Sequence, residues 1–334
     1  MESTFMLTRR RIIQNAGLFL GFAMSGSFSA NASVSEASAG LVVPFPAGGG
    51  GDVLARSVSG ALAEELATRI WVDNRPGAGG TIGARHLSRA RADGSMLGYV
   101  TNGILCVNPL LYPNVPFNPR EELRPVGMIS EIGLIGVLNP NAIAGVTDLE
   151  SLVAWAKAHP KEVNFASSGI GTTSHLAGLL FARRAGIELT HVPYRGGAAA
   201  MLDVLSGRIP FMIDVAPNAL PHVKSGKLLP LGAASRSRLA IAPDIPTFAE
   251  AGVAGIELSA WDGIVLPKGA SDKLVERVAS ALARALKHPE VVASLSKKGA
   301  EPRPGTSADF IRFIEAESPK WAELVEAVQA ETSR

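Results

Sequence analysis

Three glycine-rich turns, each between a predicted strand and a predicted helix, constrain this chain most strongly. They occupy residues 48–51, 77–80 and 169–171. Glycine frees backbone N–H groups at a helix N-terminus, where they hold a carboxylate or phosphate without a cationic side chain. In open α/β sheets such turns lie at the carboxyl ends of strands, where ligands bind. Two facing sheets would therefore direct several helix N-termini at one cleft, although glycine is also the default residue of a plain connecting turn.

Strand and helix signals alternate along the chain, which favours an α/β architecture with largely parallel sheets. The helix after the first turn has Leu54, Val58, Leu62 and Leu66 on one face. Later helices are predicted at 149–159, after Ser271 and from Pro289, and Pro319 is expected to end one helix before the last. Strands are predicted at 41–43, 70–73, 97–100, 132–138, 164–166, 191–194, 210–214 and 263–266. Four prolines predict an extended, irregular stretch between Pro109 and Pro119.

Composition excludes several classes of protein. A chain of 334 residues with 47% hydrophobic residues is long enough for two ordinary domains. Its net charge of +2, without a basic and aromatic strip, argues against a nucleic-acid partner. The single cysteine, Cys106, rules out a disulfide framework and is expected to be buried.

The N-terminus is typical of a cleaved export signal. Arg9-Arg10-Arg11 precede an apolar stretch over 12–24, and Ala30-Asn31-Ala32 provides a cleavage site. Residues 1–32 are therefore predicted to be a signal peptide, of the Sec or the twin-arginine type, with translation starting at Met1 or Met6. The mature protein is expected to begin near Ser33 and to be periplasmic. No later segment is apolar for long enough to form a membrane helix.

The sequence motifs of common enzymes and metal sites are not complete in this chain, because most lack one or more required residues. A dinucleotide fingerprint needs a third glycine where this chain has Val53, Ile82 or Ser174. Residues 41–73 still follow the strand, turn, helix, strand and acid order of a nicotinamide site, so an α/β oxidoreductase stays the alternative. The six histidines are scattered and predict no metal site. His175 lies next to hydroxyl residues, where capping or packing is favoured over acid–base chemistry.

Several short motifs together resemble the Bug family, the periplasmic solute-binding proteins of tripartite tricarboxylate transporters. Each motif is weak alone, but their order and spacing over the mature chain are specific. They are VPFPAGG at 43–49, VDNRPGAGG at 72–80, ADG at 92–94, HVPYRG at 191–196, ALPH at 219–222 and PDIPT at 243–247.

The resemblance implies a type II periplasmic-binding-protein fold, with two α/β domains, a hinge and a ligand cleft between them, and no catalysis or cofactor. The implied domains are 33–133 plus 258–334, and 134–257. A small carboxylate ligand, membrane permease subunits as partners and a monomeric state are expected; a sensory role is the alternative within this class. The implied contacts are Phe45, Ala47, Gly48 and Gly49 on one lip with Asn102 beside them, Ser167, Gly171, Thr172 and Thr173 on the other lip, and Tyr194, Asp214 and Trp261 near the floor.

Carboxylate binding is expected to depend on backbone amides, because no arginine lies within the three glycine turns and Arg195 only flanks a fourth. Valine at Gly48 or Gly171 is therefore expected to abolish binding. The sequence departs from the family at Gly51, Ala199 and Asp262. Asp262 either lies near the cleft, where it repels a second ligand carboxylate and favours a monocarboxylate or a ligand with an amine or hydroxyl at its far end, or points away and pairs with a surface lysine.

Overall fold

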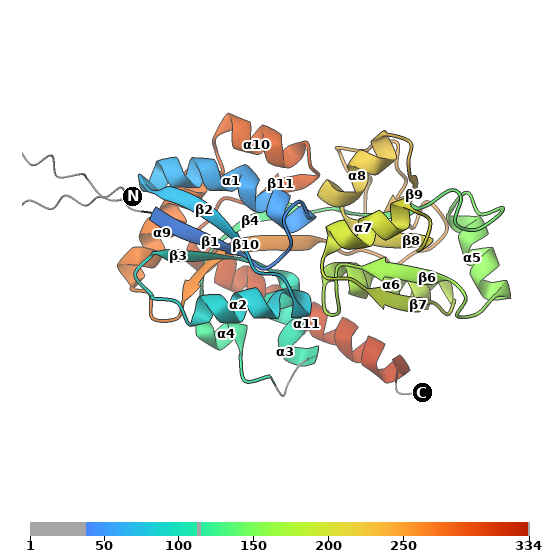
Figure 1. The fold of residues 1–334 in the computed structure, drawn as a ribbon, viewed down its shortest axis with the longest axis horizontal. Helices are drawn as coiled ribbons and strands as arrows, with labels where there is room; N and C mark the ends of the chain where they lie inside the picture. The colour runs from blue at the N-terminus through green and yellow to red at the C-terminus, as the bar shows by residue number, and fades with distance from the viewer. Residues whose placement is uncertain (1–37, 112–114, 333–334) are drawn as a thin grey trace, which may run out of the picture. The chain divides into compact units, whose positions relative to one another are not determined.

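The computed structural model describes residues 38–111 and 115–332, which contain two β-sheets with helices packed against them (Figure 1). The predicted signal peptide lies outside the described residues. The strand order of the first sheet is β11-β4-β10-β3-β1-β2, and that of the second is β7-β6-β8-β5-β9. Among the described helices, none is long and apolar enough to cross a membrane.

The first sheet combines a parallel half with an antiparallel half. Strand β1 (Ser38–Val43) is parallel to β2 (Arg69–Asn74) and to β3 (Met96–Thr101). Strand β10 (Ala260–Pro267) is antiparallel to β3 and to β4 (Leu123–Ile132). The edge strand β11 (Ala300–Pro302) is antiparallel to β4.

The second sheet repeats this mixture. Strand β6 (Asn164–Ser167) is parallel to β7 (Thr190–Pro193) and to β8 (Phe211–Val215). Strand β5 (Leu134–Leu138) is antiparallel to β8 and to β9 (Leu229–Ala233). The expectation of largely parallel sheets is therefore wrong for the strands that link the two sheets, β4, β5, β9 and β10, which run antiparallel to their neighbours.

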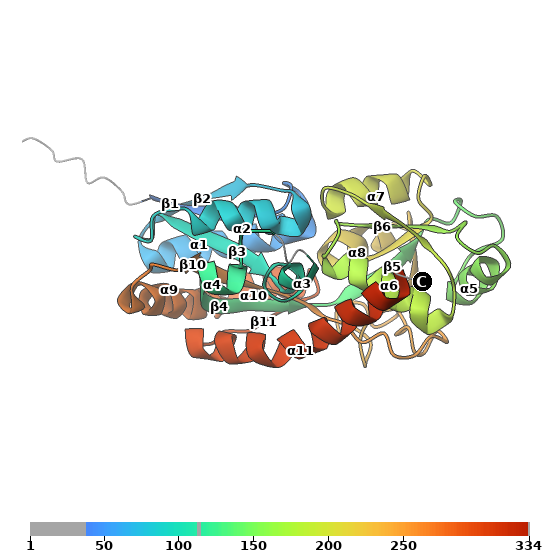
Figure 2. The same ribbon diagram turned by 90° about the horizontal axis from the view of Figure 1, so that it is seen from below.

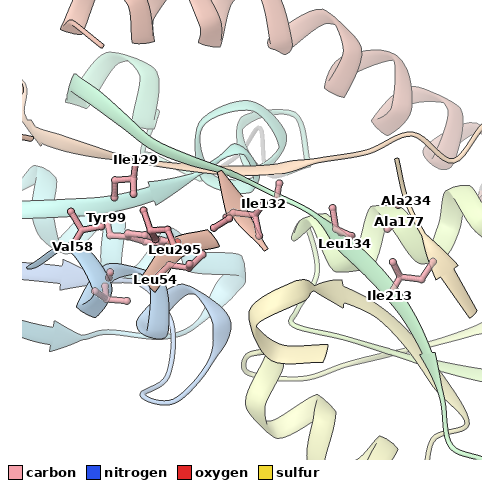
Figure 3. Packing of buried hydrophobic residues seen from close by; sticks show 14 of the residues in the cluster. Leu54, Val58, Tyr99, Ile129, Ile132, Leu134, Ala177, Ile213, Ala234 and Leu295 are labelled. Atoms are coloured by element: carbon pink, nitrogen blue, oxygen red, sulfur yellow. The ribbon is translucent and has the colours of Figure 1, made fainter. Parts of the chain in front are cut away.

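The chain passes from the first sheet to the second at Gly133. Strand β4 ends at Ile132 and β5 begins at Leu134, so the single strand predicted over 132–138 is two strands. The Gly133 carbonyl accepts a 2.8 Å bond from the Ala216 amide, and its amide donates a 3.1 Å bond to the Gly299 carbonyl. Figure 3 shows Ile132 and Leu134 on either side of this passage, within one buried apolar cluster that includes residues of both sheets. The return passage lies between Ala233 and Ala260.

The helices begin and end largely where local sequence signals place them. In α1 (Gly50–Leu66), the predicted face of Leu54, Val58, Leu62 and Leu66 is buried. Ser271 caps α9 (Asp272–Ala285), as predicted, by accepting a bond from the Leu274 amide. The other helices are α2 (Thr81–Ser88), α5 (Leu149–Ala158), α6 (Thr173–Ala185), α7 (Gly197–Leu205), α8 (Ala216–Lys224) and α10 (Pro289–Ser296).

Two stretches containing prolines differ from expectation. The region after Pro109 contains short helices, α3 (Asn108–Leu111) and α4 (Pro119–Glu122), instead of an extended segment. Pro119 occupies the first turn of α4, where its missing N–H leaves no intrahelical bond unmade. The last helix, α11 (Ser307–Thr332), continues through Pro319, so the predicted break is wrong.

Helix α11 is held on both sides of that proline by tertiary packing. It contacts β4, the π-helical turn η2 (Gly103–Val107) and α6 of the second sheet, and Figure 2 shows it running beneath the first sheet towards α6. Phe310 precedes Pro319 and Trp321 follows it, and both side chains are buried. Burial of such aromatic surface offsets the hydrogen bond that proline removes.

Candidate functional site

A cavity of about 60 Å³ lies where helices of the first and second sheets meet. We call it the main cavity. It has room for only a small polar group or a few waters. Its lining residues are Phe45, Pro46, Gly49, Gly50, Gly51, Leu54, Tyr99, Thr101, Asn102, Ile132, Ser168, Thr172, Thr173, Ser174, Gly197, Asp214, Val215 and Ala260.

Four helices begin at the main cavity. Gly50 and Gly51 open α1, and Thr173 and Ser174 open α6. Gly197 is the first residue of α7, and Val215 is the N-cap of α8. The N-terminal amides of a helix have no intrahelical acceptor, and its dipole places partial positive charge there. The cavity is therefore electrostatically suited to an anion.

The N-terminal amides of α1, α6 and α7 are largely without side-chain caps, whereas in α8 the Ala216 amide is bonded to the Gly133 carbonyl and Pro217 has no N–H. In α1, α7 and α8 no side chain makes a capping hydrogen bond. In α6, the Thr172 hydroxyl accepts a 3.4 Å bond from the His175 amide, as capping predicts, and leaves the earlier amides of that turn uncapped. Glycine at the N-cap of α1, Gly49, thus allows a ligand to take the place of a capping side chain.

Two buried polar atoms in the cavity wall have no partner among the described residues. They are the Asn102 Nδ2 amide and the Ser174 hydroxyl. The Asn102 side chain is oriented by its other end, because Thr173 Oγ1 donates a 3.0 Å bond to Asn102 Oδ1. An unsatisfied buried polar group costs roughly 1–3 kcal/mol, so these two atoms indicate a polar ligand.

Asp214 is the one charged residue in the described lining of the main cavity. Its side chain is buried and accepts a 2.6 Å bond from Asn218 Nδ2. Burial raises the pKa of Asp214 to about 6, because the ionised carboxylate loses hydration. No cationic side chain lines the described cavity, so an anion would be held by backbone amides and neutral donors.

Six of the twelve predicted contact residues line the main cavity: Phe45, Gly49, Asn102, Thr172, Thr173 and Asp214. The other six, Ala47, Gly48, Ser167, Gly171, Tyr194 and Trp261, do not line it. Gly48 instead donates a 2.9 Å bond to Asp52 Oδ2, and an added Cβ there would have no atom within 4 Å. At Gly171 the added Cβ would approach Asn108 Oδ1 to 2.4 Å, so steric blocking is expected at Gly171 but not at Gly48.

Trp261 and Asp262 are both buried in the first sheet. The Trp261 ring packs edge-on against Phe310 and Phe313, with centroids 5.6 Å from each. Asp262 accepts bonds from the Tyr99 hydroxyl at 2.6 Å and from the Ser130 amide and hydroxyl at 2.9 and 2.7 Å. Both sequence-based interpretations of Asp262 are therefore wrong: it neither lines the cavity nor pairs with a surface lysine.

Ser167 and His175 belong to a partly buried group that also includes His191. Ser167 Oγ lies 2.6 Å from His191 Nε2, and the rings of His175 and His191 are 4.1 Å apart. Burial lowers the pKa of His175 to about 3 and that of His191 to about 4, so both rings are neutral at neutral pH. This arrangement agrees with the expectation that His175 has a packing role. No group of three or more possible metal ligands occurs among the described residues.

A second cavity, of about 210 Å³, adjoins the first. We call it the mouth cavity. It shares Phe45, Pro46 and Ser168 with the main cavity. Its remaining wall consists of Pro44, the second glycine turn with Pro76, Gly169 and Ile170 of the third turn, and the segment from Pro193 to Gly196. The glycine turns are therefore divided between the two cavities.

Sequence reasoning missed several residues of the main cavity, including Ser174, Gly197 and Val215. Ser174 could have been found as a hydroxyl in the first turn of a helix that follows a glycine turn. Gly197 belongs to a fourth glycine turn before a helix and could have been found in the same way, whereas Val215 ends a buried strand and carries no such signal. The position of Val215 depends on the topology.

The sequence profile described as the tripartite tricarboxylate transporter family receptor (TctC) matches residues 54–330. The chain belongs to this receptor family. Among its relatives, it is 35% identical over 286 residues to protein BugT of Bordetella pertussis, which covers 85% of this chain and 87% of BugT.

Two solved receptor-like structures resemble this chain over most of its length. An R. palustris protein determined with adipate has a TM-score of 0.84 and 31% identity, covering 89% of this chain and 98% of that one. MatC from Rhodopseudomonas palustris with bound malate has a TM-score of 0.81 and 29% identity, covering 86% and 98%. The receptor therefore has the two-domain periplasmic-binding-protein fold that the sequence predicts, with a cleft between α/β domains.

Proposed function

We propose that this receptor is an extracytoplasmic solute-binding protein that captures a small carboxylated metabolite and delivers it to a tripartite tricarboxylate-type permease. The observation that carries the proposal is the main cavity: the N-termini of α1, α6 and α7, two unpaired polar side-chain atoms and no cationic side chain in the described lining. The similarity to proteins solved with adipate and malate supports a carboxylate as the ligand.

The proposed contacts come from the two sides of the cleft. Backbone amides at Gly50 and Gly51 and at Thr173 and Ser174 would bind the carboxylate oxygens. Asn102 Nδ2 and the Ser174 hydroxyl would complete the hydrogen bonds. Phe45 and Leu54 would cover the apolar part of the ligand. None of these groups is a nucleophile paired with a base, so we propose a binding protein without catalytic activity.

The proposed domains are residues 33–133 plus 258–334, and residues 134–257. The passage at Gly133 supports the first boundary, since strands of the two sheets meet there. Closure about this hinge would bring the N-termini of α1 and α6 onto one ligand. We further propose export by a cleaved signal peptide over residues 1–32, a monomeric periplasmic state and docking to membrane permease subunits.

A thermal-shift screen of residues 33–334 tests this function. Succinate, malate, citrate and adipate are compared with NAD and NADP. A ligand present at 100 times its Kd and bound only by the folded state adds about 2.7 kcal/mol to the free energy of unfolding. We expect stabilisation by at least one carboxylate and none by the nucleotides. Stabilisation by NAD or NADP alone would overturn the proposal in favour of an oxidoreductase.

A further inference from the structure

The mouth cavity carries one formal charge, and it is positive. Arg195 lines it, and no acidic residue does so among the described residues of its wall. The Arg195 side chain is exposed and makes no ion pair or hydrogen bond with the described residues. Other arginines at this end of the fold are already paired: Arg75 with Asp73 at 2.6 Å and Arg56 with Asp52 at 2.9 Å.

The acid that contacts the wall of the mouth cavity is already paired. Asp203 accepts a 2.6 Å bond from the hydroxyl of Tyr194, which also lines the mouth cavity. Asp203 pairs with Arg208 at 2.6 Å as well, and these two hydrogen bonds lower its pKa. Asp203 therefore has its own partners, Tyr194 and Arg208, and forms no ion pair with Arg195.

The rest of the mouth cavity suits a hydrocarbon chain. Pro44, Pro76 and Pro193 contribute apolar rings to its wall, and Ile170 is 44% exposed there. Phe45, Pro46 and Ser168 belong to both cavities, so a ligand group leaving the main cavity beside them enters the mouth cavity. Near the shared wall, the first and second sheets approach closely, because a Cβ at Gly196 would lie 2.5 Å from Pro46 Cδ.

We infer that the mouth cavity is a second anion subsite, and that Arg195 selects elongated ligands with a negatively charged group at each end. This inference rests on the proposed function. One carboxylate would occupy the main cavity, the methylene chain would pass Phe45, and the distal carboxylate would reach Arg195. The two subsites differ in kind, since the inner one uses fixed backbone dipoles and the outer one a mobile guanidinium.

Matched ligand pairs test the inference by isothermal titration calorimetry on residues 33–334. The pairs are butyrate and succinate, pentanoate and glutarate, hexanoate and adipate, and octanoate and suberate, which differ only in the distal carboxylate. In the pair of best-fitting length we expect the dicarboxylate to bind more tightly. Arg195→Gln should weaken the binding of that dicarboxylate by about three- to tenfold. The affinity for the matching monocarboxylate should be unchanged. Raising NaCl from 0.05 to 0.5 M should have a similar selective effect.

Two control variants isolate the charge at this position. Arg195→Lys keeps the charge and should retain most of the dicarboxylate preference. Arg89→Gln removes an exposed arginine that lines neither cavity and should change neither ligand of the pair. The inference would be overturned if the two ligands of every pair had equal affinities, or if Arg195→Gln reduced both affinities of a pair equally. Either result would leave the proposed function intact. Failure of every carboxylate to bind would overturn both.

Discussion

Thr173 Oγ1 donates a 3.0 Å hydrogen bond to Asn102 Oδ1, joining the start of α6 to the end of β3. This bond fixes the Asn102 amide so that its Nδ2 atom, which has no described partner, is left for a ligand. Asn102 directly follows β3 of the first sheet, and Thr173 begins a helix that packs against the second sheet. The bond therefore links the two sides of the main cavity.

Asn102→Ala should weaken carboxylate binding by about tenfold, because both the ligand donor and the bond to Thr173 are lost. Thr173→Val removes only the bond between the two sheets and should weaken binding less. Calorimetric titration of the two single variants and the double variant measures the coupling. Additive losses would contradict the idea that Thr173 acts through Asn102.

Asp214 should make binding pH-dependent. Its pKa, raised to about 6 by burial, leaves it largely ionised at pH 8. A ligand carboxylate in the same cavity repels the ionised form, so binding should take up a proton and weaken as pH rises from 6 to 8, by at most about tenfold per pH unit. Titration in two buffers of different ionisation enthalpy measures the proton uptake. Asp214→Asn should remove it, and a pH-independent wild-type affinity would show that Asp214 stays out of ligand binding.

Asp262 should affect stability and leave ligand preference unchanged. Burial raises its folded-state pKa from 3.8 to about 6, so the folded chain binds the proton more tightly than the unfolded chain. This contribution is fully present below pH 3.8 and is lost as pH rises through 6, and it amounts to roughly 3 kcal/mol. Urea unfolding at pH 4 and pH 7 should show a smaller difference in Asp262→Asn than in wild type. An altered order of preference among mono- and dicarboxylates in this variant would contradict its placement outside the cavity.

Gly50→Ala should weaken carboxylate binding, whereas Gly60→Ala in the same helix should not. A Cβ at Gly50 would lie 2.5 Å from Val215 Cγ2, across the cleft, whereas a Cβ at Gly60 meets nothing within 4 Å. Gly50→Ala should thus hinder closure and weaken carboxylate binding by about tenfold or more. Gly60→Ala, in the interior of α1, should raise the free energy of unfolding by about 0.5–1 kcal/mol without altering affinity. Chemical denaturation and calorimetry on both variants give the two quantities, and equal affinities would refute the role assigned to Gly50.

The predictions from sequence succeeded where local chemistry decides the structure. The periodicity from Leu54 to Leu66 predicts the buried face of α1, and the helix predicted after Ser271 is α9, which Ser271 caps. Asn102 and Asp214, which the family resemblance implies as ligand contacts, both line the main cavity.

Predictions failed where tertiary packing overrides local preference. Pro319 should end a helix, but burial of Phe310 and Trp321 on either side keeps α11 continuous. Asp262 follows a tryptophan that the family motif places near the cleft, yet the alternation of a strand does not reveal that Tyr99 and Ser130 enclose its carboxylate. Three glycine turns predict one shared cleft, but the second lines only the mouth cavity.

A crystal structure of residues 33–334 with the tightest carboxylate from the panel tests the central claim most directly. The account predicts one carboxylate in the main cavity, with its oxygens within hydrogen-bonding distance of backbone amides in the first turns of α1 and α6 and of Asn102 Nδ2. A ligand whose carboxylates contact only arginine side chains, with the main cavity left to water, would contradict it.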